Sequence, residues 1–182
     1  RYIREDVPGS SAARNRALRE AKHEFVAFTD DDAAPDPNWL RSLLQNFSDP
    51  RVMCVTGLVM PLELETEAQE WFERYSPHGR GFYRLVFDGA KDNPLIVATV
   101  GVSASMALRK SLIDFIGLFD EDLGAGTPTV GGEDCELFAR ILRSGYRIVY
   151  EPRALSWHRH RRTWEELQKT LQGYGIGVYA FW

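Results

Sequence analysis

The fold is decided by one segment, Glu24-Phe25-Val26-Ala27-Phe28-Thr29-Asp30-Asp31-Asp32, which runs a short apolar stretch directly into three carboxylates. The apolar part is typical of a buried strand. Because side chains alternate along an extended chain, we expect Asp30 and Asp32 to point to one side and Asp31 to the other. Adjacent acids repel one another, and a hard divalent cation relieves that repulsion. The segment predicts a strand that ends in a metal site, with a solvated acidic turn as the alternative.

The composition of the 182-residue chain indicates one globular domain. It is 44% hydrophobic and 26% charged, and its net charge of −4 provides no positive field for nucleic acid. Cys54 and Cys135 lie far apart, which indicates neither a disulfide framework nor a zinc knuckle and fits a reducing cytoplasm. No apolar run reaches the roughly 18 residues of a membrane span. The start, Arg1-Tyr2-Ile3, resembles the middle of a strand, so we expect a fragment of a longer protein.

Helical and strand patterns alternate along the chain, which predicts an α/β layered domain. The expected helices run from Ser10 or Ser11 to Ala21, from Pro37 to Phe47, from a Thr66 cap to Tyr75, over 109–117, from Glu133 to a stop at Gly145, and from a Thr163 cap onward. The expected strands after the first cover 52–60, 146–150 (ended by Pro152) and 154–158, and residues 95–100 and 103–108 are expected to form one or two strands, broken at Gly101. An ordered loop is expected over 76–93.

Two further charged positions are candidates for chemistry. Arg14 lies near the start of a helix, where a cation opposes the dipole, so it either reaches a carboxylate or awaits an anion. Glu133 and Asp134 follow the glycine-rich loop 124–132, of the kind that often gates a site. These two acids are either dipole partners of a helix or include a carboxylate base aimed into a cleft.

The C-terminal part combines histidine, arginine and aromatic residues. His158 and His160 would share one face of a strand and could complement an acidic metal site. The basic stretch 159–162 is either a solvated patch or a contact for anionic lipid. Residues 163–182 are expected to form a separate amphipathic helix with an aromatic end, close to a membrane.

With these motifs in place, the chain resembles the family 2 glycosyltransferases of the GT-A fold. The resemblance rests on Gly9-Ser10-Ser11-Ala12-Ala13-Arg14-Asn15, on the strand that ends in Asp30-Asp31-Asp32, and on Gly132-Glu133-Asp134. It implies a GT-A-type domain over 1–162, with Rossmann-like α/β/α layers around a mixed central sheet. It also implies that this piece lacks the N-terminal nucleotide-binding strand of the family.

The resemblance assigns a role to each carboxylate of the first cluster. In the family this cluster is the D-x-D-type motif, so Asp30 and Asp31 are expected to contact the nucleotide sugar. Asp30 and Asp32 are expected to hold Mn²⁺ or Mg²⁺ together with His158, with His160 as the reserve ligand.

The remaining motifs supply the nucleotide contact and the base. Arg14 and Asn15 match residues that contact the nucleotide or its phosphates in the family. Glu133 and Asp134 match the catalytic acid pair, and we favour Asp134 as the base.

Together these assignments imply an inverting, metal-dependent transferase. It would move a sugar from a nucleotide-diphosphate sugar, expected to be a UDP-sugar, to a hydroxyl of a carbohydrate or lipid-linked acceptor in polysaccharide or glycoconjugate synthesis. The implied location is the cytoplasm, peripheral to the inner face of the cell membrane. On the residues alone two other classes remain open: an aspartate-based phosphotransferase or phosphatase, and a non-catalytic divalent-metal or carbohydrate-binding module.

Overall fold

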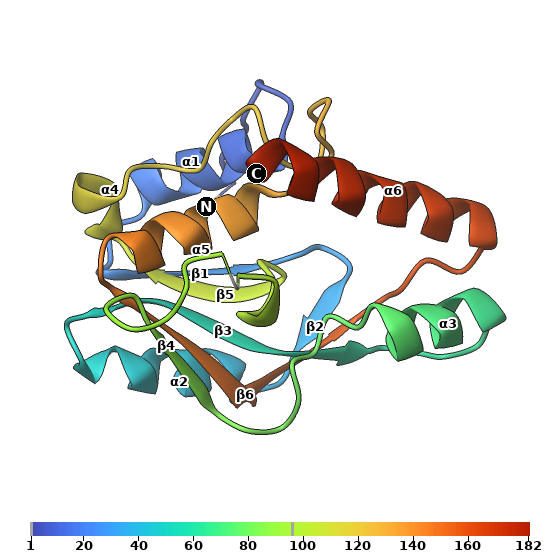
Figure 1. The fold of residues 1–182 in the computed structure, drawn as a ribbon, viewed down its shortest axis with the longest axis horizontal. Coiled ribbons are helices and arrows are strands. Elements are labelled where there is room, and N and C mark those ends of the chain that lie inside the picture. Colours follow the sequence, from blue (N-terminus) through green and yellow to red (C-terminus); the bar gives the residue numbers. More distant parts are fainter. Residues whose placement is uncertain (1, 96) are drawn as a thin grey trace.

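The computed structural model describes residues 2–95 and 97–182, which form a mixed sheet between layers of helices (Figure 1). Among these residues β3 and β6 pair in parallel, and the other strand pairs are antiparallel. The strands follow the order β1 (Phe25–Thr29), β5 (Ser105–Arg109), β3 (Val52–Pro61), β6 (Arg147–His158) and β2 (Ala33–Pro35), and β4 (Leu85–Asp88) shares the outer edge of β6 with β2. The mixed α/β sheet confirms the expected fold class.

The helices are divided between the two faces of the sheet. Figure 1 shows α1, α4, α5 and α6 on one face, α2 on the other, and α3 at the end of the sheet below α6. Their bounds are α1 (Ser10–Glu20), α2 (Trp39–Leu44), α3 (Glu67–Tyr75), α4 (Leu112–Phe115), α5 (Glu133–Arg143) and α6 (Trp164–Phe181), with 3₁₀ turns η1 (Gln45–Ser48) and η2 (Val97–Thr99).

The hydrophobic core fills both faces of the sheet. Neighbouring residues of β3 enter different clusters: Cys54 packs with Leu18 of α1 and Phe138 of α5, whereas Val55 packs with Leu43 of α2. This division follows from the alternation of side chains along a strand that is buried on both faces. The core therefore holds the ends of β1 and β6 and the start of α5 in fixed positions.

Several predicted boundaries are confirmed because short local motifs encode them. Thr66 and Thr163 each form a capping box, with Gln69 and Glu166 respectively, at the starts of α3 and α6. Gly145 follows α5 with a φ of 79°, a conformation that favours glycine at the end of a helix.

Three predictions about strands and loops are wrong. β6 continues through Pro152, because three extra residues bulge out between the pairs Gly57↔Glu151 and Leu58↔Leu155, and a bulge tolerates proline. The expected loop 76–93 contains β4. The expected strand 95–100 instead contains η2, and its residue 96 lies outside the described residues.

Three predicted helix starts or lengths also need correction. Gly9 caps α1 without a side-chain hydrogen bond, while the Ser11 hydroxyl donates to the Leu123 carbonyl at 2.7 Å. The Asn38 N–H donates to the Asp36 carboxylate at 2.8 Å, and α2 begins only at Trp39. The helix predicted over 109–117 is the short α4.

The C-terminal α6 packs on the rest of the molecule. Its buried Leu167 lies in a cluster with Ala68 and Phe72 of α3. Near its other end, Gly177 approaches Gly132 so closely that an added Cβ would meet backbone. The division into 1–162 and 163–182 stays a prediction, and the structure shows α6 covering α3 and α5.

Candidate active site

The acidic stretch after β1 is a tight turn, in which the Ala33 N–H donates to the Asp30 carbonyl at 3.2 Å. The turn places one carboxylate oxygen each of Asp30 and Asp32 and one ring nitrogen of His158 within 4.8 Å of one another. Asp31 is exposed and lies outside this group. The expected separation of the three acids is therefore observed, although a turn produces it and not strand alternation.

The sheet brings His158 to the acidic turn. β2 pairs with the end of β6 so that Ala33 lies opposite His158, and the His158 Nε2 is 3.1 Å from the Asp32 carboxylate. Burial raises the pKa of Asp30, while Arg14 and His158 oppose that rise. Two carboxylates and one imidazole form a donor set suited to Mn²⁺, and carboxylates also suit Mg²⁺.

Arg14 connects the acidic turn to α5. Its Nη1 lies 2.7 Å from the Glu133 carboxylate and its Nη2 lies 3.7 Å from that of Asp30. Nη2 also donates to the Ser103 hydroxyl at 3.1 Å. Sequence analysis left two roles open for a cation near the start of this helix, and the structure supports the first, an arginine that reaches carboxylates. Its guanidinium faces the cavity described below.

Glu133 and Asp134 differ in their surroundings although they are neighbours at the start of α5. Glu133 is bound by Arg14, and the Ser10 hydroxyl donates to it at 3.4 Å. Asp134 accepts backbone N–H bonds from Ser103 at 3.2 Å and Cys135 at 2.8 Å. Burial, and then the neighbouring Glu133, raise the pKa of Asp134. A carboxylate with a raised pKa is a stronger base, which is the property that general-base catalysis needs.

All these side chains face one cavity of about 1020 Å³. That volume is at the upper end of the range of small-molecule sites, roughly 300–1,000 Å³. The predicted residues that line it are Arg14, Asp30, Asp31, Asp32, Glu133, Asp134, His158 and His160. The structure thus gathers residues from α1, the end of β1, α5 and the end of β6 at one place.

Asn15 is the predicted site residue that the structure does not bring to the cavity. Its side-chain amide donates to the Phe119 carbonyl at 2.9 Å and accepts from the Phe119 N–H at 2.8 Å. It also donates to Glu121 at 2.8 Å. Asn15 is 1% exposed, and it fastens the turn after α4 to α1.

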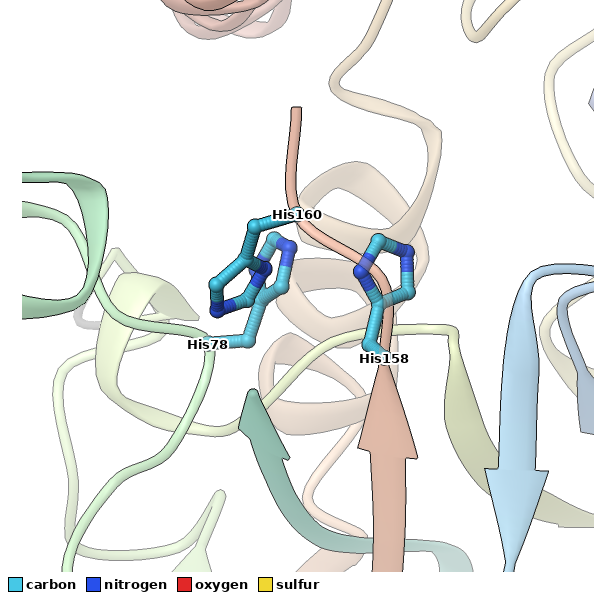
Figure 2. Close-up of side chains that lie close together, drawn as sticks. All are labelled: His78, His158 and His160. Atoms are coloured by element: carbon cyan, nitrogen blue, oxygen red, sulfur yellow. The ribbon is translucent and has the colours of Figure 1, made fainter. Parts of the chain in front are cut away.

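His78, which lies in the loop after α3, was not predicted as a site residue. Its ring stands beside those of His158 and His160 at the cavity wall (Figure 2). Burial lowers the pKa of His78 to about 3 and that of His160 to about 4. The only local signal is a histidine between Pro77 and Gly79, and nothing in that pattern links it to histidines 80 residues away.

A family model described as Glycosyltransferase like family 2 matches residues 1–172. The chain belongs to this family. This family 2 chain is 35% identical over 156 residues to the pre-mycofactocin glycosyltransferase of Mycobacterium tuberculosis, covering 84% of the chain and 30% of the relative. It is 30% identical over 153 residues to the O-antigen chain rhamnosyltransferase WbaN of Salmonella anatum, covering 82% and 46% respectively. The chain thus spans less than half the length of these relatives.

Solved structures show the same fold. The mannosyltransferase PcManGT from Pyrobaculum calidifontis, in complex with GDP-Man and Mn²⁺, superposes with a TM-score of 0.60 at 20% identity, covering 94% of this family 2 chain and 43% of that chain. GalNAc-T7 with UDP, GalNAc and Mn²⁺ gives a TM-score of 0.58 at 17% identity, covering 88% and 32%. These likenesses identify the fold of this chain as GT-A.

Proposed function

We propose that this chain carries the donor site and catalytic base of an inverting glycosyltransferase. One observation carries the proposal: the half-buried carboxylate of Asp134 lines the same cavity as the Asp30, Asp32 and His158 group, and Arg14 pairs with Asp30 and with Glu133, the neighbour of Asp134. The cavity thus combines a base with groups that can hold an anionic leaving group. This combination, together with the family, favours sugar transfer over the phosphotransferase and non-catalytic binding alternatives.

The proposed reaction uses Asp134 as the base. Asp134 takes the proton of the acceptor hydroxyl, and that oxygen attacks the anomeric carbon from the face opposite the nucleotide. The bond from the anomeric carbon to the diphosphate oxygen breaks, and the configuration is inverted. The Arg14 guanidinium faces the same cavity and can stabilise the negative charge that develops on the diphosphate.

The residues present fit a divalent cation. Asp30, Asp32 and His158 would hold Mn²⁺ or Mg²⁺ through two carboxylates and one imidazole nitrogen, whose ligand atoms already lie within 4.8 Å of one another. Asp30 is a partly buried carboxyl whose charged form is disfavoured by desolvation, so a nearby cation would stabilise that charged form. When bound, the ion would neutralise charge on the diphosphate.

The donor, the acceptor and the location are finer parts of the proposal. We infer a UDP-sugar donor and a carbohydrate or lipid-linked acceptor, as the family resemblance implies. None of the helices in residues 2–95 and 97–182 combines the length and the apolar composition that a membrane span requires. A peripheral contact with the inner face of the cell membrane is supported by Tyr179 of α6, an aromatic side chain that is exposed.

The experiment that tests the proposal is calorimetric binding of UDP, GDP and dTDP with and without Mn²⁺. We expect binding of one nucleotide that requires Mn²⁺, that is lost in Asp32→Ala, and that persists in the matched control Asp114→Ala, which removes an exposed carboxylate outside the cavity. Metal-independent binding, or equal binding by both variants, would contradict a metal site at Asp32. The same titration is made on the chain extended at its N-terminus, and absence of binding of all three nucleotides by that longer protein would overturn the donor site.

A further inference from the structure

We propose that His78, His158 and His160 form a second metal site, suited to Zn²⁺ or a similar transition-metal ion, beside the acidic group. The three rings lie 5.1 to 5.7 Å apart between centroids. One nitrogen from each ring can be chosen so that all three lie within 4.8 Å of one another. Figure 2 shows one ring nitrogen of His158 and one of His160 facing each other, with His78 beside them.

The buried nitrogens of this histidine triad (His78, His158 and His160) point to a ligand. His158 is 9% and His160 3% exposed, and the Nδ1 atoms of both are buried without a hydrogen-bond partner. A buried polar atom without a partner costs free energy, and native structures usually provide one. An ion between the rings would give both nitrogens a partner.

The other nitrogen of each buried ring already faces a carboxylate. The His158 Nε2 is 3.1 Å from Asp32, and the His160 Nε2 is 3.2 Å from Glu73. A histidine that binds a metal usually donates its second ring N–H to a carboxylate or carbonyl, which fixes the tautomer and turns the lone pair to the ion. Asp32 and Glu73 place both rings in the tautomer that leaves Nδ1 free for coordination.

The donor set of the triad indicates the class of ion. Three neutral imidazoles suit Zn²⁺ and its neighbours, whereas Mn²⁺ and Mg²⁺ prefer oxygen ligands such as those of Asp30 and Asp32. Three histidines with a fourth position open are an established zinc geometry. The triad lines the cavity, so a fourth ligand could come from water or a bound molecule.

The shared His158 couples the triad to the acidic group, and this step rests on the proposed function. A neutral imidazole has one free lone pair. When its Nδ1 binds an ion in the triad, its Nε2 carries the proton and donates to Asp32. When its Nε2 binds an ion with Asp30 and Asp32, its Nδ1 carries the proton. Zn²⁺ in the triad should therefore weaken Mn²⁺-dependent nucleotide binding.

The test titrates the metal-free protein with Zn²⁺ alone and with Co²⁺ alone, using calorimetry and the visible spectrum of Co²⁺. We expect one Zn²⁺ per chain in the wild type and in His23→Ala, which removes the exposed histidine outside the triad. His78→Gln should weaken Zn²⁺ binding by about 100-fold or more, and Glu73→Gln by about 10-fold, because loss of a supporting carboxylate typically costs about 10–100-fold in affinity. Circular dichroism checks that each variant is folded.

Asp30→Asn separates this proposal from the proposed function. It should abolish Mn²⁺-dependent UDP binding and leave the Zn²⁺ affinity unchanged, because Asp30 is outside the triad. If Asp30→Asn weakens Zn²⁺ binding as much as His78→Gln does, the ion binds the acidic group and the triad proposal fails. Zn²⁺ binding that is indifferent to both His78→Gln and Glu73→Gln overturns the proposal as well. If His78→Gln does not fold, Glu73→Gln alone decides the outcome.

Discussion

The two acidic pairs of the cavity, Asp30 with Asp32 and Glu133 with Asp134, carry equal formal charge in opposite surroundings. The first pair lies in a turn at the end of a strand, partly open to solvent, and faces His158. The second pair begins a helix, where Asp134 is held by two backbone N–H bonds and Glu133 by Arg14. Under the proposed function, position, and not residue type, separates the cation-binding carboxylates from the carboxylate that acts as a base.

The largest effect is expected when the first pair is deprived of the cation that the proposed function places there. Chelation by EDTA, or Asp32→Ala, should reduce sugar transfer by about 10⁴-fold or more, because a metal contributes several kcal/mol to stabilising charge in such reactions. Initial rates with and without added Mn²⁺ measure this effect, and Asp114→Ala is the control. Full activity in EDTA would show that the first pair does not work through a metal.

The second pair is tested by replacing the base while keeping its shape. Asp134→Asn should lower kcat by about 10²–10⁴-fold while nucleotide binding persists, because a general base contributes about that much. The matched variant is Glu133→Gln, which we expect to lose less, since the Glu133 carboxylate is already bonded to Arg14. A larger loss in Glu133→Gln would transfer the role of base to Glu133.

Features that a few contiguous residues encode could be predicted from the sequence. The strand that ends in aspartates and the caps at Thr66 and Thr163 are each encoded by a few contiguous residues, so local pattern was sufficient. Asn15 follows Arg14 directly, but successive residues of a helix point in different directions, and Asn15 turns to the core while Arg14 turns to the cavity.

The features that escaped prediction depend on contacts between distant segments. His78 lies beside His158 because α3 packs beside the end of β6. No local pattern in the sequence predicts a contact between these two segments. Proline usually ends a regular strand because it has no N–H to donate, but β6 continues through Pro152 because a bulge opposite β3 accommodates it. β4 has only four residues and lies in a stretch that contains Gly79, Gly81 and Gly89, so its strand pattern was too short to detect.

Arg14 links the two acidic pairs through Asp30 and Glu133, and a third variant removes this link. Arg14→Met should lower the free energy of unfolding by about 3 kcal/mol, because it leaves Glu133 charged and largely buried without its partner. The double variant Arg14→Met with Glu133→Gln should recover much of that loss. Urea unfolding of the four proteins in this cycle measures the coupling. Additive losses would show that the ion pair does not contribute to stability.

The smallest expected effect concerns stability and its dependence on pH. Burial raises the pKa of Asp134 in the folded state above its ordinary value of 3.8, so the folded protein binds this proton more tightly than the unfolded chain does. The protonated Asp134 carboxyl therefore contributes to the free energy of unfolding. This contribution is fully present below pH 3.8 and is lost as the pH rises through the pKa of Asp134 in the folded state. At about pH 7 the uncharged Asp134→Asn should therefore be more stable than the wild type by about 1 kcal/mol, a trade of stability for activity.

That gain in stability should shrink as the pH is lowered toward 3.8. Urea midpoints across this range measure the change, and Asp31→Asn, which removes the exposed carboxylate of the first cluster, is the matched control. A loss of stability in Asp134→Asn at neutral pH would mean that its two backbone hydrogen bonds outweigh the cost of burying the charge. Asp134 would then be a structural carboxylate, and the contrast between the two acidic pairs would disappear.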